Sequence, residues 1–150
     1  MIAATVAFDL VLVAHIVVAV ASVVVLVALR TGATLVARGA DLADQRRRFP
    51  LRRDWAARVV HLLPVTGLAL VATGGASVRL TRPWVLVGLA CYLALAGHLE
   101  ARTLPQERQV ARAAASPAGA PPALGRALAR SVDVLVSLLA LALVAMIVQF

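Results

Sequence analysis

Long runs of apolar residues alternate along this chain with stretches rich in arginine. The apolar runs cover residues 2–29, 55–76, 84–101 and 132–148. A helix rises about 1.5 Å per residue, so roughly 20 residues cross a hydrocarbon layer about 30 Å thick. Valine is abundant in these runs, but within lipid each segment must satisfy its own backbone, which favours helix over strand. The pattern predicts an all-α protein, with four transmembrane helices forming one integral membrane domain over residues 1–150.

The second run combines membrane-spanning length with residues that a membrane normally excludes. Trp55 opens it, as an interfacial aromatic residue would, and Arg58 and His61 follow one turn apart. Residues three apart share a face of a helix, so this pair predicts an inward-facing polar patch near one end. Pro64 cannot donate to the carbonyl of Val60, four residues back, so we expect a local bend or a substitute donor there.

The arginines are unequally distributed among the connections. All 15 basic residues are arginines, and all but Arg79 and Arg82 lie in or beside the long loops over residues 30–54 and 102–131. Because positive residues concentrate in cytoplasmic loops, these two loops are predicted to face the cytoplasm and both termini the outer side. Residues 116–122 are rich in proline and small residues, which is typical of a flexible linker.

The composition is typical of a membrane protein, and it affects which partner the positive charge indicates. Hydrophobic residues make up 62% of the chain, charged residues 15%, and the mean hydropathy is +0.93. The net charge is +8, and the arginines that produce it lie beside apolar runs. This position favours anionic lipid headgroups over nucleic acid as the partner. The single Cys91 excludes a disulfide framework within one chain. No soluble-enzyme motif is present, and we predict neither a catalytic residue nor a metal site.

Ionisable residues of three runs fall at similar depths from the predicted cytoplasmic boundary. By helical rise, His61 lies roughly 9 Å inside this boundary, His98 about 6 Å inside it, and Asp133 some 5 Å beyond the last loop arginine. These three residues are therefore predicted to come within reach of one another. His15 lies roughly 22 Å from the first loop arginine, near or beyond the midplane, and belongs to a different layer.

Three interpretations of these residues stay open. Two neutral imidazoles on different helices can act as axial ligands of haem b, with Arg58 or Arg102 pairing with a propionate. Alternatively, His61 and His98 are interfacial residues that hydrogen-bond and close the cytoplasmic end of the bundle. The third interpretation is a proton relay, which needs water between the layers. The candidate cofactor-binding residues are His15, His61, His98, Arg58 and Arg102, and the intramembrane polar cluster comprises Glu100, Asp133 and Ser137.

Several short motifs lie within and beside the runs. They are His15-Ile16-Val17-Val18, Pro64-Val65-Thr66-Gly67-Leu68, and Trp84 with Leu104-Pro105-Gln106-Glu107-Arg108. In these motifs the chain resembles the CopD-like superfamily of small bacterial membrane proteins, above all a branch of uncharacterised four-helix proteins. More distantly it resembles the HemJ-type protoporphyrinogen oxidases, in His15-Ile16 and in Arg130 with Asp133. The resemblance implies a four-helix protein of the bacterial cytoplasmic membrane and suggests haem ligation by His15.

The predicted function is that of a non-enzymatic accessory or structural component of a membrane complex, with haem b as a candidate cofactor. One alternative is a haem-dependent membrane oxidoreductase of HemJ type. The other is a small transporter or channel component. The expected partners are anionic lipid headgroups and either another membrane protein or a second copy of the chain.

Overall fold

A computed structural model describes residues 2–51, 57–74 and 80–148, and these residues form helices and connections without any strand. The first half contains α1 (Ile2–Ala37), α2 (Leu42–Arg48), the 3-10 segment η1 (Ala57–His61) and α3 (Leu62–Thr73). The second half contains α4 (Pro83–His98), the π-helical segment η2 (Leu99–Thr103), α5 (Leu104–Ala115) and α6 (Pro122–Val148). Because α4, η2 and α5 follow without interruption, they form one long helical rod.

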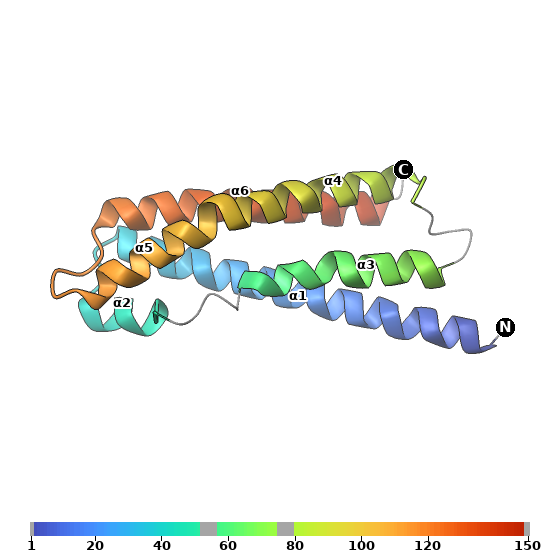
Figure 1. Cartoon of the computed structure of the whole chain (residues 1–150), viewed down its shortest axis with the longest axis horizontal. Coiled ribbons are helices and arrows are strands. Elements are labelled where there is room, and N and C mark those ends of the chain that lie inside the picture. The colour runs from blue at the N-terminus through green and yellow to red at the C-terminus, as the bar shows by residue number, and fades with distance from the viewer. Residues whose placement is uncertain (1, 52–56, 75–79, 149–150) are drawn as a thin grey trace.

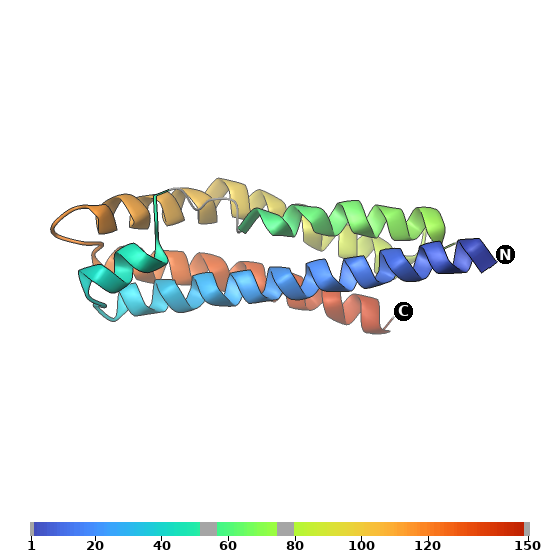
Figure 2. The same ribbon diagram turned by 90° about the horizontal axis from the view of Figure 1, so that it is seen from below.

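The long helical segments lie side by side along the molecule (Figures 1 and 2). The pair α1 and α6 forms the centre, with α3 packed against α1 and α4 packed against α6. The start of α1 and the end of α6 lie at the same end of the molecule, while α2 and α5 lie at the opposite end (Figure 1). This arrangement separates an apolar bundle from an arginine-rich end.

Three helical segments are long and apolar enough to cross a membrane. They cover Val6–Ala37, Pro83–Ala115 and Pro122–Val148. The apolar helix Arg58–Thr73 is shorter, and both ends of the predicted second span, Trp55 and Ala76, lie outside the described residues. The all-α class is therefore confirmed, together with three helices of spanning length, and the fourth span stays a prediction.

The predicted loop over residues 102–131 is mostly helical. Helix α5 occupies Leu104–Ala115 and α6 begins at Pro122, so only residues 116–121 connect the two helices. The high charge of this region concealed an amphipathic helix, because the apolar residues of α5 recur on one buried face and its arginines on the other. The buried residues of that face are Leu104, Val110, Ala111 and Ala114.

Two prolines within the apolar and basic stretches lie next to a change of helical type. The 3-10 segment η1 ends three residues before Pro64, and the π-helical segment η2 ends two residues before Pro105. A proline removes the hydrogen bond to the carbonyl four residues back and crowds that carbonyl. A change to the bonding pattern of a 3-10 or π-helix relieves both problems. The irregularity predicted at Pro64 therefore takes the form of η1.

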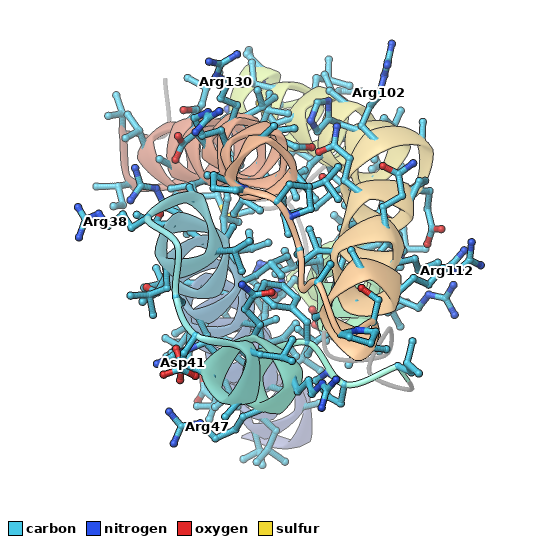
Figure 3. The ribbon with its side chains drawn as sticks, turned by 90° about the vertical axis from the view of Figure 1, so that its left-hand side faces the viewer. Arg38, Asp41, Arg47, Arg102, Arg112 and Arg130 are labelled. Carbon is cyan, nitrogen blue, oxygen red and sulfur yellow. The ribbon has the colours of Figure 1, made fainter. Side chains whose placement is uncertain are left out.

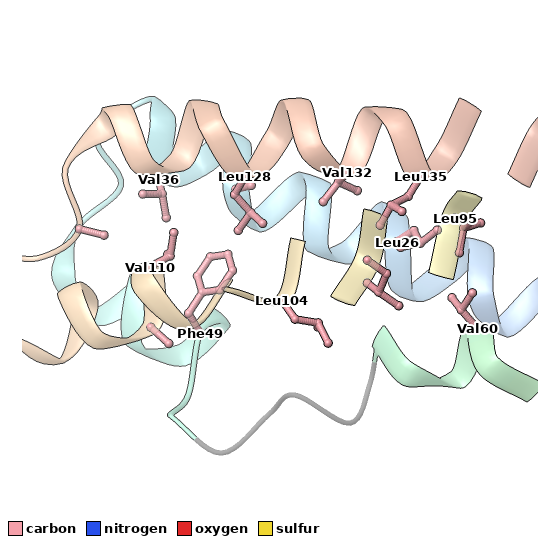
Figure 4. Close-up of a cluster of buried hydrophobic side chains, with 14 of the residues drawn as sticks. Leu26, Val36, Phe49, Val60, Leu95, Leu104, Val110, Leu128, Val132 and Leu135 are labelled. Carbon is pink, nitrogen blue, oxygen red and sulfur yellow. The ribbon is translucent and has the colours of Figure 1, made fainter. Parts of the chain in front are cut away.

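The hydrophobic core continues past the apolar bundle into the arginine-rich end, which we call the cap (residues 31–51 and 104–129). Its buried residues come from α1, from the residue after α2, and from α5 and α6, as Val36, Phe49, Val110 and Leu128 show (Figure 4). The Gln45 side chain is also buried there. Its Nε2 donates to the Ala40 carbonyl at 2.8 Å, and its Oε1 accepts from the Ala120 N–H at 2.7 Å. The cap is therefore a packed helical unit rather than a pair of loops.

Charged side chains fix the ends of the short helix α2 within the cap. The Asp41 carboxylate accepts from the Asp44 N–H at 2.8 Å and so caps the start of the helix. Hydrogen bonds from Arg48 and then Arg47 hold the pKa of the Asp44 carboxyl below its usual value. The stabilisation by Asp44 is thus present at neutral pH and is lost as acid protonates this carboxylate. At the other side of α2, Arg46 Nε donates to the Ala114 carbonyl near the end of α5 at 3.0 Å.

Candidate functional site

Polar side chains from α1, η1, α4, η2 and α6 meet at one level of the molecule, between the apolar bundle and the cap. Hydrogen bonds and ion pairs between neighbouring helices define this level. We call this set the polar layer, and it comprises Arg30, Arg58, His61, Tyr92, His98, Glu100, Arg102, Thr103, Ser131 and Asp133. It includes six of the eight residues predicted as site residues, and the other two, His15 and Ser137, lie outside it.

One part of the polar layer is built around His61. Its Nδ1 lies 3.2 Å from the Tyr92 hydroxyl and its Nε2 lies 3.1 Å from Glu100 Oε1. A neutral imidazole protonated at Nε2 satisfies both contacts, since it donates to Glu100 and accepts from Tyr92. Arg58 Nε lies 3.7 Å from the same Glu100 oxygen, and both of these side chains are about half exposed. This network joins η1 to the rod, and its exposed ion pair contributes about 0–1 kcal/mol to stability.

A second part of the polar layer joins η2 to α6. His98 Nε2 lies 3.0 Å from Ser131 Oγ, and Thr103 Oγ1 lies 2.8 Å from the same oxygen. Thr103 and Ser131 are buried. The wider turn of a π-helix brings residues five apart onto a similar face, which lets His98 and Thr103 share one partner. The π-helical segment η2 therefore has a local role, because it directs two polar side chains to a single serine.

Asp133 pairs with a residue that the sequence analysis did not connect to it. Its Oδ1 accepts from Arg30 Nε at 2.5 Å, which joins α6 to α1. The signal was present in the sequence, because Arg30 directly follows the first apolar run and Asp133 is the second residue of the last one. In antiparallel helices these two positions fall at the same level. Asp133 therefore neutralises an arginine rather than a histidine.

His15 lies deep in the apolar bundle, in a separate layer as its distance from Arg30 predicts. It is buried, and its Nδ1 lies 2.7 Å from Thr66 Oγ1 on α3. The Thr66 hydroxyl also lies 2.9 Å from the Leu62 carbonyl, and it can donate to this carbonyl while it accepts from an N–H at His15 Nδ1. The imidazole also packs beside Gly67, where a Cβ would lie 3.6 Å from His15 Cε1, an ordinary van der Waals distance. His15 thus fixes α3 against α1.

The arrangement of the imidazoles does not fit a haem held between His61 and His98. Glu100 faces His61, and residues two apart on a helix point to different faces, so His98 is directed elsewhere, toward α6. Both Nε2 atoms already have polar partners, Glu100 and Ser131. Arg102 is exposed in the polar layer, and Ser137 is exposed on α6 outside it. Over the part of the chain that the structure describes, no three His, Cys, Asp or Glu residues are grouped to hold a metal ion.

Fold and polar layer together define an all-helical protein with helices of membrane-spanning length and a packed basic cap. No known protein family, no curated protein and no solved structure matches this chain.

Proposed function

We propose that the protein is a four-span integral membrane protein of the bacterial cytoplasmic membrane, with both termini outside and the cap in the cytoplasm. We further propose that it serves as a non-enzymatic accessory component of a membrane complex. The observation that carries the proposal is the spacing between charged levels. From Arg82 to Glu100 on the rod, 18 residues span roughly 27 Å of helix, and on α6 the part that follows Arg130 is as long, from Arg130 to Val148. This length matches the hydrocarbon layer.

The surface of the apolar bundle supports placement in lipid. Apolar side chains on the outer faces of the helices are exposed there, where a water-soluble protein would carry polar residues. On α1 they form a nearly continuous face that includes Val13, Val17, Val20 and Val24. Lipid chains would cover these valines without removing any polar side chain from water.

The contacts in the polar layer support a structural role over catalysis. His61, His98 and Asp133 each bond to a polar side chain of a neighbouring helix, which fixes the helices relative to one another. A cavity of about 260 Å³ lies away from these residues, in the cap beside Phe49 and Ala111. The non-enzymatic role is therefore favoured over a HemJ-type oxidoreductase and over a transporter.

Thiol labelling tests the proposed topology. In a Cys91→Ala background, we expect Thr81→Cys, before α4, to react with an impermeant thiol reagent in spheroplasts. We expect Ala118→Cys, in the connection between α5 and α6, to react only after the membrane is permeabilised. Both positions are exposed in the structure, so access depends on the membrane alone. Labelling of Ala118→Cys alone would invert the topology.

A visible absorption spectrum tests the absence of a haem role. Because His61 and His98 face different neighbours, we expect protein purified from haem-supplemented cells to show no Soret band. An oxidised and a dithionite-reduced spectrum of the folded protein in mild detergent provide the measurement. Any Soret band from the folded protein would overturn this prediction. A band that disappears in both His61→Ala and His98→Ala but persists in His15→Ala would identify His61 and His98 as the ligands, and porphyrinogen oxidation by such a protein would favour the oxidoreductase.

A further inference from the structure

Four exposed arginines stand at the level of the polar layer, one each on α1, η1, η2 and α6. Arg30 pairs with Asp133 and Arg58 pairs with Glu100. Arg102 and Arg130 are also exposed, and neither has an acidic partner among residues 2–51, 57–74 and 80–148. Among the described residues, Arg102 and Arg130 are therefore positive charges without a paired carboxylate, at the boundary between the apolar bundle and the cap.

These two arginines flank a single contact between helices. Thr103 and Ser131, whose hydroxyls lie 2.8 Å apart, directly follow Arg102 and Arg130 in the sequence. Arg102 and Arg130 extend from the same side of the molecule (Figure 3). Arg126 is exposed one turn before Arg130 and adds a third positive charge to this side of α6. The seam between η2 and α6 thus has arginines on both of its edges.

The surface on the membrane side of the seam is mainly apolar. The exposed row of α6 that begins with Arg126 and Arg130 continues through Val134, Ser137 and Leu141 at helical spacing, so one hydroxyl is its only polar group beyond Arg130. On α4, a Cβ placed at Gly97 would meet no atom within 4 Å, so space is open beside that helix. An amphiphile fits this surface, because its anionic head can lie at the arginines and its apolar chains along the mainly apolar surface beside them. A second copy whose twofold axis passed through the seam would instead bring like charges together.

We propose that Arg102 and Arg130 form a binding site for the phosphate of an anionic phospholipid, on the outer face of the seam between η2 and α6. Guanidinium groups donate paired, charge-assisted hydrogen bonds to phosphate oxygens, and basic sites between cytoplasmic helix ends are suited to anionic headgroups. The inference rests on the proposed membrane placement. It separates the seam arginines from those of the cap, since Arg112 lies ten residues, roughly 15 Å, beyond Arg102 and so beyond a Debye length of about 8 Å.

Native mass spectrometry of the full-length protein in mild detergent, titrated with phosphatidylglycerol, tests the site. We expect the double variant Arg102→Gln/Arg130→Gln to bind this lipid roughly tenfold more weakly or worse than the parent protein. The matched control is Arg38→Gln/Arg112→Gln, which removes the same charge from two exposed positions in the cap. It is expected to stay within about twofold of the parent.

Four outcomes would overturn the lipid site. They are equal losses in the two double variants, no loss in either variant, equal binding of phosphatidylcholine, and displacement of the lipid by millimolar inorganic phosphate, which would assign the site to a free anion. Membrane fractionation of the same proteins separates this failure from that of the proposed function. Protein that stays in the membrane with unchanged lipid binding overturns the site alone, whereas parent protein found outside the membrane overturns the proposed function.

Discussion

Replacing Gly125 with alanine is expected to destabilise the protein by about 1–3 kcal/mol, although the change adds one methyl group. Gly125 is buried where α6 crosses α1 in the cap. A Cβ at this position would lie 2.7 Å from the Ala33 carbonyl oxygen and 2.9 Å from Ala37 Cα, and closer still to the Ala37 amide nitrogen. These are backbone atoms of a helix, so they cannot rotate away as a side chain does. The two helices must move apart, which loosens the packing around them.

A second helical glycine provides the matched control for this prediction. Gly97, in α4, has open space around its Cβ position, so Gly97→Ala creates no clash. Alanine also has the higher helix propensity, by about 0.8–1 kcal/mol. Thermal unfolding of both variants in one detergent, followed by circular dichroism, should show a lower midpoint for Gly125→Ala and an unchanged or higher midpoint for Gly97→Ala. Equal midpoints for the two variants would contradict the close approach of α1 and α6.

Depth along the helices could be predicted from the sequence because helical rise is constant. His98 and Asp133 were expected at similar levels, and His98 contacts Ser131, two residues before Asp133. His61 contacts Glu100, two residues after His98, and so lies at this level as well. His15 was expected in another layer, where it contacts Thr66 instead. The depth of each candidate residue along the bundle thus follows from the number of residues between it and the end of its apolar run.

The direction in which each of these side chains points around its helix axis could not be predicted in the same way. A small rotation of a helix leaves the depth of a side chain unchanged but gives it a different partner. The rotation depends on packing across the whole bundle and here also on η2, whose wider turn directs both His98 and Thr103 to Ser131. For this reason the expected meeting of His61, His98 and Asp133 is replaced by three separate contacts at one level.

The cap was missed because charge and proline content were interpreted as signs of loops. In α5 the arginines lie on the exposed face of an amphipathic helix, whose opposite face buries Val110 and Ala114. Residues 116–121 do form a connection, as their composition indicates, but Ala120 within them is buried. Short amphipathic helices of this kind depend on tertiary packing for their stability, which a local pattern of residues does not reveal.

Replacing Gln45 with alanine is expected to open the cap locally. The Gln45 side chain joins α2 to the connection between α5 and α6, and its loss leaves the buried Ala120 N–H without its acceptor. Such an unsatisfied donor costs about 1–3 kcal/mol, which corresponds to roughly a 5- to 150-fold larger population of opened cap. Trypsin cleaves after arginine, and Arg46, Arg47 and Arg48 lie in the helix that opens. Native-state cleavage in α2 should therefore accelerate by a factor in this range, provided that reclosing is faster than cleavage.

An exposed glutamine on α5 provides the control for this effect. Gln109→Ala removes the same atoms from a side chain that faces solvent, so the cleavage rate in α2 should stay that of the parent protein. Gln45→Glu retains an acceptor for the Ala120 N–H but loses the donor to the Ala40 carbonyl and buries a charge, so it should also accelerate cleavage. If α2 were instead part of a flexible loop, all three variants would be cleaved as fast as the parent protein. Acceleration in the two Gln45 variants alone would show that the arginines of the cap are displayed on a folded surface.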